Sequence, residues 1–209
     1  MGVVTVSRLF GAGGTRVSTA VAEALGYALV DRELVEMAAR HAGIDPEAAR
    51  HLDERAPALI ERAGFALAAA SPEFGLEVPP PLDDRALADG VRAVIASLAE
   101  TGGYVILGRG GQAALRDRDD VVHLQLVGSL EDRARSVAEW QGIGFAEARD
   151  RCRRVDAERA EYVRRVHGVD IADPLLYEAV LNTSRLGLEG AAAAAVEISR
   201  RRLGLTPSA

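Results

Sequence analysis

The chain has 209 residues, 48% of them hydrophobic and 27% charged, which is the balance of an ordinary globular protein with room for one core and a small inserted subdomain. The formal net charge of -6 argues against broad binding to nucleic acid or a membrane surface, and no apolar run reaches the roughly 18–20 residues that span a bilayer. The single cysteine, Cys152, excludes an internal disulfide and favours a reducing, cytoplasmic setting.

Short apolar runs alternate with helical patterns along the chain. The first run, at the amino end, lacks the basic flank of a signal peptide and is expected to be a strand. The expected strands are 3–6, 28–30, 104–107, 121–127 and 179–182. Helices are expected at 17–24, 34–43, 145–166 and 189–202, with a further one capped by Ser129 and Asp132. Strands separated by helices predict an α/β fold with a parallel sheet covered on both faces.

Two segments are too long for simple crossovers. Residues 46–103 contain no convincing strand and are expected to form a helical insert, interrupted by prolines within 71–81. Residues 144–168 are expected to form an arginine-rich helical excursion. We expect both to cover an active-site face of one domain spanning 1–209.

A glycine-rich turn, Gly11-Ala12-Gly13-Gly14-Thr15, separates the first strand from the first helix. This arrangement directs backbone N–H groups and a helix N-terminus at an anion, and the Thr15 hydroxyl is placed to bind Mg²⁺ between two phosphates. The usual phosphate loop ends in Gly-Lys-Ser/Thr. Here Gly14 occupies the lysine position, and all 25 basic residues of the chain are arginine. The alternative is a glycine turn that serves tight packing alone.

A dinucleotide-binding site is a further alternative. Asp31 lies 20 residues after Gly11, at the end of the second predicted strand, where an acidic residue binds the ribose of NAD. However, the third glycine of that motif is replaced by Arg16, so the pattern matches this class less well.

Arginines supply most of the remaining candidates. Arg109 follows the third strand in a glycine-flanked loop, where ligands of open α/β sheets usually bind; the alternative is a structural ion pair. In the predicted helix 145–166, Arg149, Arg153 and Asp156 are spaced to share one face, and a solvated, salt-bridged surface is the alternative. Asp31 could instead cap the following helix.

Several further segments stand out, in chain order: Val4-Thr5-Val6-Ser7-Arg8, Phe10-Gly11-Ala12-Gly13-Gly14, Leu29-Val30-Asp31-Arg32-Glu33-Leu34, Val105-Ile106-Leu107-Gly108-Arg109-Gly110, Asp156-Ala157-Glu158-Arg159-Ala160 and Leu181-Asn182-Thr183-Ser184-Arg185-Leu186-Gly187-Leu188-Glu189-Gly190. Together and in this order they resemble the cytidylate kinase-like phosphate-loop proteins. The resemblance implies a three-layer phosphate-loop fold with about five parallel strands, a monophosphate-binding insert and an arginine-rich lid. It also implies transfer of the ATP γ-phosphoryl group to CMP or dCMP with Mg²⁺.

The resemblance also implies roles for single residues. The ATP phosphates would contact Gly11, Ala12, Gly13, Gly14, Thr15 and Arg16, with Thr15 at Mg²⁺. The acceptor nucleotide would contact Asp31, Arg32, Arg109 and Asp156, and the catalytic charge would come from Arg109, Arg153, Arg154 and Arg159. True cytidylate kinases carry the loop lysine. Arg8 or Arg16 could replace it here, and in a kinase the missing charge is expected to come chiefly from Arg109 and the lid. A nucleotide-binding regulator without turnover and a kinase for another acceptor remain as alternatives.

Overall fold

The computed structural model describes residues 1–31 and 84–205. The chain divides into two compact units, one formed by Met1–Asp31 with Ile95–Ala209 and the other by Arg32–Val94. Three predicted features lie outside the described residues, namely Arg32, the helix at 34–43 and the proline interruption within 71–81. Within the predicted insert, Asp84–Thr101 forms helix α4.

Five parallel strands form one sheet, in the order β2-β3-β1-β4-β5. Their bounds are β1 Val3–Arg8, β2 Ala28–Val30, β3 Tyr104–Leu107, β4 Val121–Val127 and β5 Ala179–Asn182, so all five predicted strands are confirmed. Strand β1 lies between β3 and β4, and β2 lies beyond β3. A dinucleotide-binding sheet would place β2 beside β1. The strand order therefore argues against the NAD alternative.

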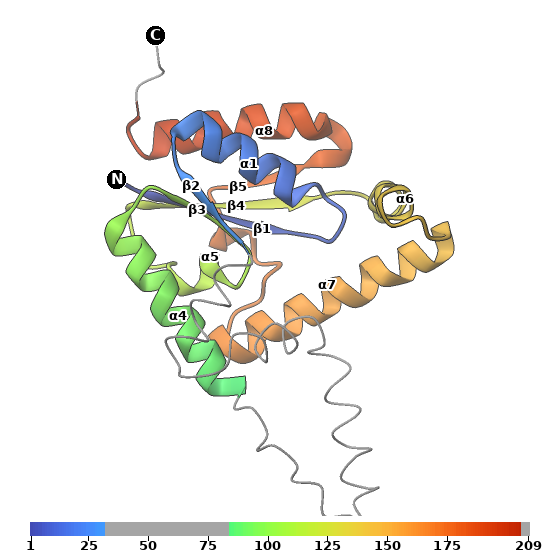
Figure 1. The fold of residues 1–209 in the computed structure, drawn as a ribbon, viewed down its shortest axis with the longest axis horizontal. Coiled ribbons are helices and arrows are strands. Elements are labelled where there is room, and N and C mark those ends of the chain that lie inside the picture. The colour runs from blue at the N-terminus through green and yellow to red at the C-terminus, as the bar shows by residue number, and fades with distance from the viewer. Residues whose placement is uncertain (32–83, 206–209) are drawn as a thin grey trace, which may run out of the picture. The chain divides into compact units, whose positions relative to one another are not determined.

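Helices cover both faces of this sheet. Figure 1 shows α1 (Gly14–Leu25) and α8 (Thr183–Arg202) side by side on one face and α5 (Gly111–Ala114) on the other. Helix α6 (Leu130–Gln141) packs against α7 (Phe145–His167). A 3₁₀ turn, Pro174–Leu176, precedes β5. Among the helices that the structure describes, none is long and apolar enough to cross a membrane.

Among the described helices, the predicted carboxyl ends are confirmed to within a residue, whereas α1 begins at Gly14, before the predicted 17. The Ser129 hydroxyl accepts the Asp132 N–H at 3.1 Å and so caps α6 as expected. Helix α8 begins at Thr183, earlier than the predicted 189, because the Asn182 side chain accepts the Ser184 N–H and starts a first turn. Gly187, with φ 69, then interrupts the regular helical path.

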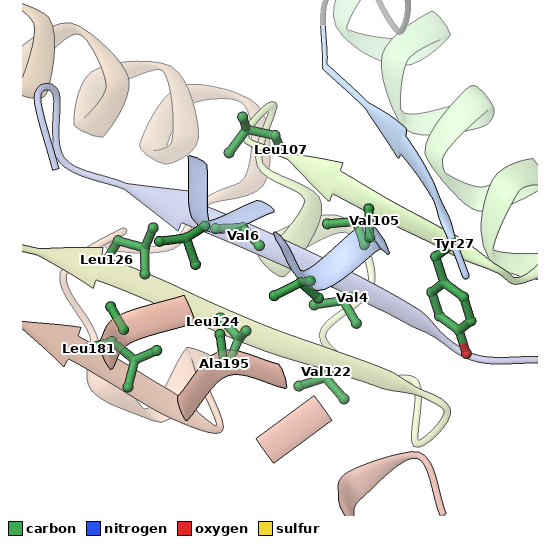
Figure 2. Packing of buried hydrophobic residues seen from close by; sticks show 14 of the residues in the cluster. Val4, Val6, Tyr27, Val105, Leu107, Val122, Leu124, Leu126, Leu181 and Ala195 are labelled. Carbon is green, nitrogen blue, oxygen red and sulfur yellow. The ribbon is translucent and has the colours of Figure 1, made fainter. Parts of the chain in front are cut away.

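The main core lies between the sheet and the α1–α8 layer. Side chains alternate along β1, so Val4 and Val6 enter this core together with residues of β3 and β4 (Figure 2). Ala191 and Ala195 are fully buried, and their small side chains allow α8 to approach the sheet closely. Each large aliphatic side chain buried here contributes about 1.5–3 kcal/mol. Aromatic residues make up only 4% of the chain, and the core is accordingly built mainly from aliphatic side chains.

Because β1 and β3 are parallel neighbours, both end at the same edge of the sheet. The chain leaves β1 at Arg8 into the glycine loop and leaves β3 at Leu107 into the loop that contains Arg109. Asp31 follows β2 at this edge as well. The fold therefore brings candidates from three distant sequence segments to one edge of the sheet, where open α/β folds bind their ligands.

Candidate functional site

The glycine loop follows β1 at Leu9 and ends in the first turn of α1 at Thr15, and its backbone favours glycine. Gly11 and Gly13 have φ values of 81 and 78, in the left-handed region. A Cβ on Gly11 would lie 2.7 Å from the Arg133 carbonyl oxygen, and one on Gly13 would collide with Leu188. Packing within the protein is thus sufficient to explain these two glycines. The two glycines therefore do not by themselves indicate anion binding.

The start of helix α1 is suited to an anion. Its N-cap is Gly13, no side chain caps its first turn, and that turn contains no acidic residue. The first N–H groups of a helix have no partner within the helix and carry a partial positive charge. Thr15 and Arg16 are exposed in this turn. Negative charge near these N–H groups is therefore favourable.

Binding of Mg²⁺ at this site would require the phosphates of a bound nucleotide as additional ligands. In the part of the chain that the structure describes, no group of three or more His, Cys, Asp or Glu residues is placed to hold a metal ion. The exposed Thr15 hydroxyl is an oxygen donor of the kind that Mg²⁺ accepts, and Mg²⁺ commonly binds through few protein ligands together with substrate phosphates. The residues present are therefore compatible with a metal held between Thr15 and nucleotide phosphates.

A buried ion pair fixes the backbone of the glycine loop. The Phe10 N–H donates to Asp156 Oδ1 at 2.7 Å, and Arg133 Nη1 donates to Asp156 Oδ2 at 2.7 Å and to the Phe10 carbonyl at 2.9 Å. Arg133 Nε also donates to the Gly128 carbonyl at 3.0 Å. Both carboxylate oxygens of Asp156 are therefore engaged inside the protein. The prediction that Asp156 binds the acceptor is not supported; the carboxylate holds the loop instead.

Helix α7 is oriented differently from the prediction. The face turned toward the protein is formed by residues spaced three or four positions apart, namely Ala148, Cys152, Asp156, Arg159 and Val163. Arg153 and Arg154 lie outside this face, with 61% and 65% of their side chains exposed, and each faces an acidic residue of the same helix. Arg153 and Asp156 are neighbours on the helix, but Asp156 turns toward the protein and Arg153 toward solvent. The structure brings neither Arg153 nor Arg154 to the glycine loop.

Arg159, by contrast, lies directly against the loop. Its Nη1 donates to the Arg8 carbonyl at 3.0 Å, and its guanidinium lies 5.6 Å from the centre of the Phe10 ring, a cation–π distance. Burial lowers the pKa of Arg159, while Asp156 and Asp31 act in the opposite direction. The guanidinium is thus held in a partly desolvated position, where charged hydrogen bonds are stronger than in water.

The turn that contains Arg109 has an unusual backbone. Gly108, Arg109 and Gly110 have φ values of 81, 58 and 71, and Arg109 is the one non-glycine residue with positive φ among those described. A left-handed conformation costs an L-residue roughly 1–2 kcal/mol. A Cβ on Gly110 would collide with the His167 ring at the end of α7. Strain of this kind concentrates at functional sites, which supports a functional role for Arg109.

Three arginines from separate segments gather beside the glycine loop. The Arg8 guanidinium lies 3.9 Å from Asp31 Oδ1. Burial and the nearby Arg159 lower the pKa of Arg8 to about 9; Asp31 counteracts this shift, and Arg109 adds to it. Cations in such proximity repel one another, and an anion placed among them would relieve that repulsion. The site is therefore electrostatically suited to phosphate.

Arg133 and Phe10 contribute to this site but were not identified as candidates from the sequence. Arg133 lies among charged neighbours that resemble a solvated surface. One signal was available: it lies three residues after Leu130 and four before Val137, on the apolar stripe of α6. An arginine on such a stripe is expected to be buried and paired, as Arg133 is.

Known proteins of similar sequence or fold include kinases. A cytidylate kinase from Pyrobaculum aerophilum is 30% identical over 194 residues, which cover 91% of this chain and 89% of that protein. An uncharacterized protein from Eubacterium ventriosum has a similar structure, with a TM-score of 0.69 at 17% identity over 95% of this chain and 98% of that one. A shikimate kinase from Bacteroides thetaiotaomicron gives a TM-score of 0.54 at 16% identity, covering 98% and 99%, and shares the fold. The model of the cytidylate kinase-like family matches residues 3–185, and the chain belongs to that family.

Proposed function

We propose that the chain is a nucleoside-monophosphate kinase of cytidylate type, which transfers the γ-phosphoryl group of ATP to CMP or dCMP. The observation that carries the proposal is the gathering of Arg8, Arg109 and Arg159 beside the N-terminus of α1. Family membership and the similarity to a cytidylate kinase support the choice of acceptor.

Phosphoryl transfer depends mainly on positioning and on stabilising charge. The N–H groups of Gly11–Thr15 would bind the donor phosphates. A phosphate oxygen of the acceptor would form the new P–O bond as the bond to ADP breaks. Mg²⁺, bound by Thr15 and the donor phosphates, would neutralise negative charge on their oxygens.

Arginines would supply the remaining positive charge. Arg109 and Asp31 lie at the sheet edge beside the loop and would face the acceptor, a role also proposed for Arg32. Arg159, from the helix α7 that occupies most of the predicted lid, would stabilise charge on the transferred group. Arginine suits this role because its planar fork binds two phosphate oxygens at once. Arg16 remains a candidate for ATP binding because it is exposed next to Thr15.

The test is a panel assay. Purified protein is incubated with MgATP and CMP, dCMP, UMP or AMP, and both ADP release and the nucleoside diphosphate are measured. Diphosphate formation with CMP or dCMP supports the proposal, and Arg159→Ala should lower kcat about 10²–10³-fold. The matched control is Arg164→Ala, because Arg164 is exposed on the same helix and faces Glu161; this variant should retain full activity.

A nucleotide-binding regulator is the second candidate, because Gly14 stands where the loop lysine is expected. ATP binding without turnover of any acceptor would favour the regulator. Phosphorylation of a small hydroxylated acceptor in place of a monophosphate would identify a kinase for another acceptor. If the protein neither binds ATP nor turns over any acceptor, nucleotide handling as a whole is refuted.

A further inference from the structure

We propose that Arg8 supplies, from the end of strand β1, the positive charge that the lysine of a usual phosphate loop would supply from the position of Gly14. The proposal deepens the function above and rests on it, since it concerns the binding of the donor phosphates. It assigns to one residue a charge that the glycine loop itself lacks.

The first observation is the space beside Gly14. A Cβ on this residue would lie 2.8 Å from Arg8 Cγ and 3.3 Å from Arg8 Cδ, and its three nearest atoms all belong to Arg8. Gly14 is the first residue of α1 and lacks the positive φ that would itself require glycine. The Arg8 side chain thus occupies the space in which a lysine side chain at this position would begin.

A second glycine accommodates the other end of the same side chain. A Cβ on Gly108 would collide with Arg8 Nη1. The guanidinium therefore lies against the turn that contains Arg109, and 3.9 Å from Asp31 Oδ1. Arg8 extends from the first residue of α1 to the side of the site proposed for the acceptor. A cation between these two sides is placed to contact the group that passes from donor to acceptor.

The electrostatic environment of Arg8 favours a phosphate ligand. Only 20% of its side chain is exposed. Burial, together with Arg159 and Arg109, lowers its pKa to about 9, against the opposing effect of Asp31. A buried guanidinium next to other cations is unfavourable until an anion binds, and charged hydrogen bonds to phosphate are among the strongest in proteins. The cost of this arrangement would be recovered when nucleotide binds.

Arg16, the other replacement considered from the sequence, is less well placed. It lies two residues after Gly14 on α1, about 200° around the helix axis, and its side chain is exposed. Nothing in the described part of the chain directs it toward the Arg109 turn. Arg8 meets both conditions that a lysine substitute requires, contact with the Gly14 position and proximity to the acceptor side.

The structure allows a reciprocal rescue experiment. Arg8→Ala removes the charge, and Gly14→Lys restores a lysine but collides with Arg8 when introduced alone. The double variant Arg8→Ala/Gly14→Lys has both the space and the charge. We expect Arg8→Ala to lower kcat about 10²–10³-fold, with a much smaller change in CMP affinity. Gly14→Lys alone should also be impaired, and the double variant should regain at least tenfold over Arg8→Ala.

Three quantities are measured for each variant. They are kcat with MgATP and CMP, the Kd values of MgATP and of adenosine by calorimetry and the ratio between them, and the melting temperature. If Arg8→Ala fails to fold, Arg8→Met, which keeps the aliphatic contact with Gly14, takes its place. Arg164→Ala is the matched control and should behave as wild type. A double variant no better than Arg8→Ala, or an Arg8→Ala enzyme within twofold of wild type, would overturn the proposal.

The outcomes also separate this inference from the proposed function. If the wild-type protein turns over and Arg8→Ala turns over equally fast, the role of Arg8 is refuted but the kinase function is not. Absence of turnover in wild type, with ATP affinity weakened at least tenfold by Arg8→Ala and restored in the double variant, refutes the kinase but supports Arg8. A wild-type protein that binds no ATP refutes both.

Discussion

The ion pair between Asp156 and Arg133 gives a quantitative prediction for the stability of the glycine loop. Asp156→Asn keeps the size of the side chain but removes the charge that faces Arg133. The two side chains are 18% and 8% exposed, so solvent screens the pair only weakly. Removing one partner of a buried pair typically costs about 3–5 kcal/mol, because the other charge stays buried without compensation.

Thermal unfolding and urea titration measure this loss. For a chain of this size, 1 kcal/mol corresponds to roughly 2–4 °C, so the melting temperature should fall by about 6–20 °C. Asp150→Asn is the matched control on the same helix: its side chain is 70% exposed and lies 3.9 Å from Arg153, and the change should stay within about 0.5 kcal/mol.

A double-mutant cycle isolates the pair itself. Arg133→Met added to Asp156→Asn removes the uncompensated charge, so the double variant should be more stable than the sum of the single changes predicts. Since Arg133 Nη1 also donates to the Phe10 carbonyl, loss of its carboxylate partner in Asp156→Asn should disturb the loop and weaken the affinity for MgATP. A loss of less than about 1 kcal/mol, with additive single changes, would refute the view that this pair holds the loop.

Three further predictions follow from other parts of the structure. Gly13→Ala should destabilise the protein by at least about 1–2 kcal/mol and weaken ATP binding, because φ is positive there and Leu188 blocks a Cβ; urea unfolding that matches wild type would contradict this. Arg153→Ala and Arg154→Ala should each leave kcat within about twofold of wild type, as expected for exposed pairs within one helix, and a large loss would show that α7 changes position during turnover. Burial lowers the pKa of His123 below 6.5, so the unfolded chain takes up the proton first and stability is lost as the pH falls below about 6.5; urea unfolding at pH 5.5 and 7.5 should show a smaller pH dependence in His123→Gln.

Local patterns in the sequence were sufficient for the strands and for the position of Arg109. Each strand is a short apolar run bounded by turn residues, and the parallel arrangement follows from the helices between them. Arg109 could be identified because its place after β3 and its flanking glycines are local properties. The strand order could not be derived from these patterns, because it depends on which edges pair in three dimensions.

The arginines of α7 show where sequence reasoning fails. Spacing shows which residues share a face of the helix. In a helix with charged residues on every side, it does not show which face is buried. The contact with α6 and the glycine loop selects the face of Cys152 and Asp156, which leaves Arg153 in solvent. The direction of Arg8 was equally undetermined, since it depends on the absence of side chains at Gly14 and Gly108.

The contacts between α7 and the glycine loop have a consequence for how the protein matures. The loop is complete in sequence by Thr15. Its Phe10 N–H is held by Asp156, and the carbonyl of Arg8, at the end of β1, is held by Arg159, about 150 residues later in the chain. During synthesis the amino-terminal part emerges first and has to wait for α7 before these contacts can form. Such long-range closure slows folding, so nucleotide-binding competence should appear late, after most of the sheet has assembled.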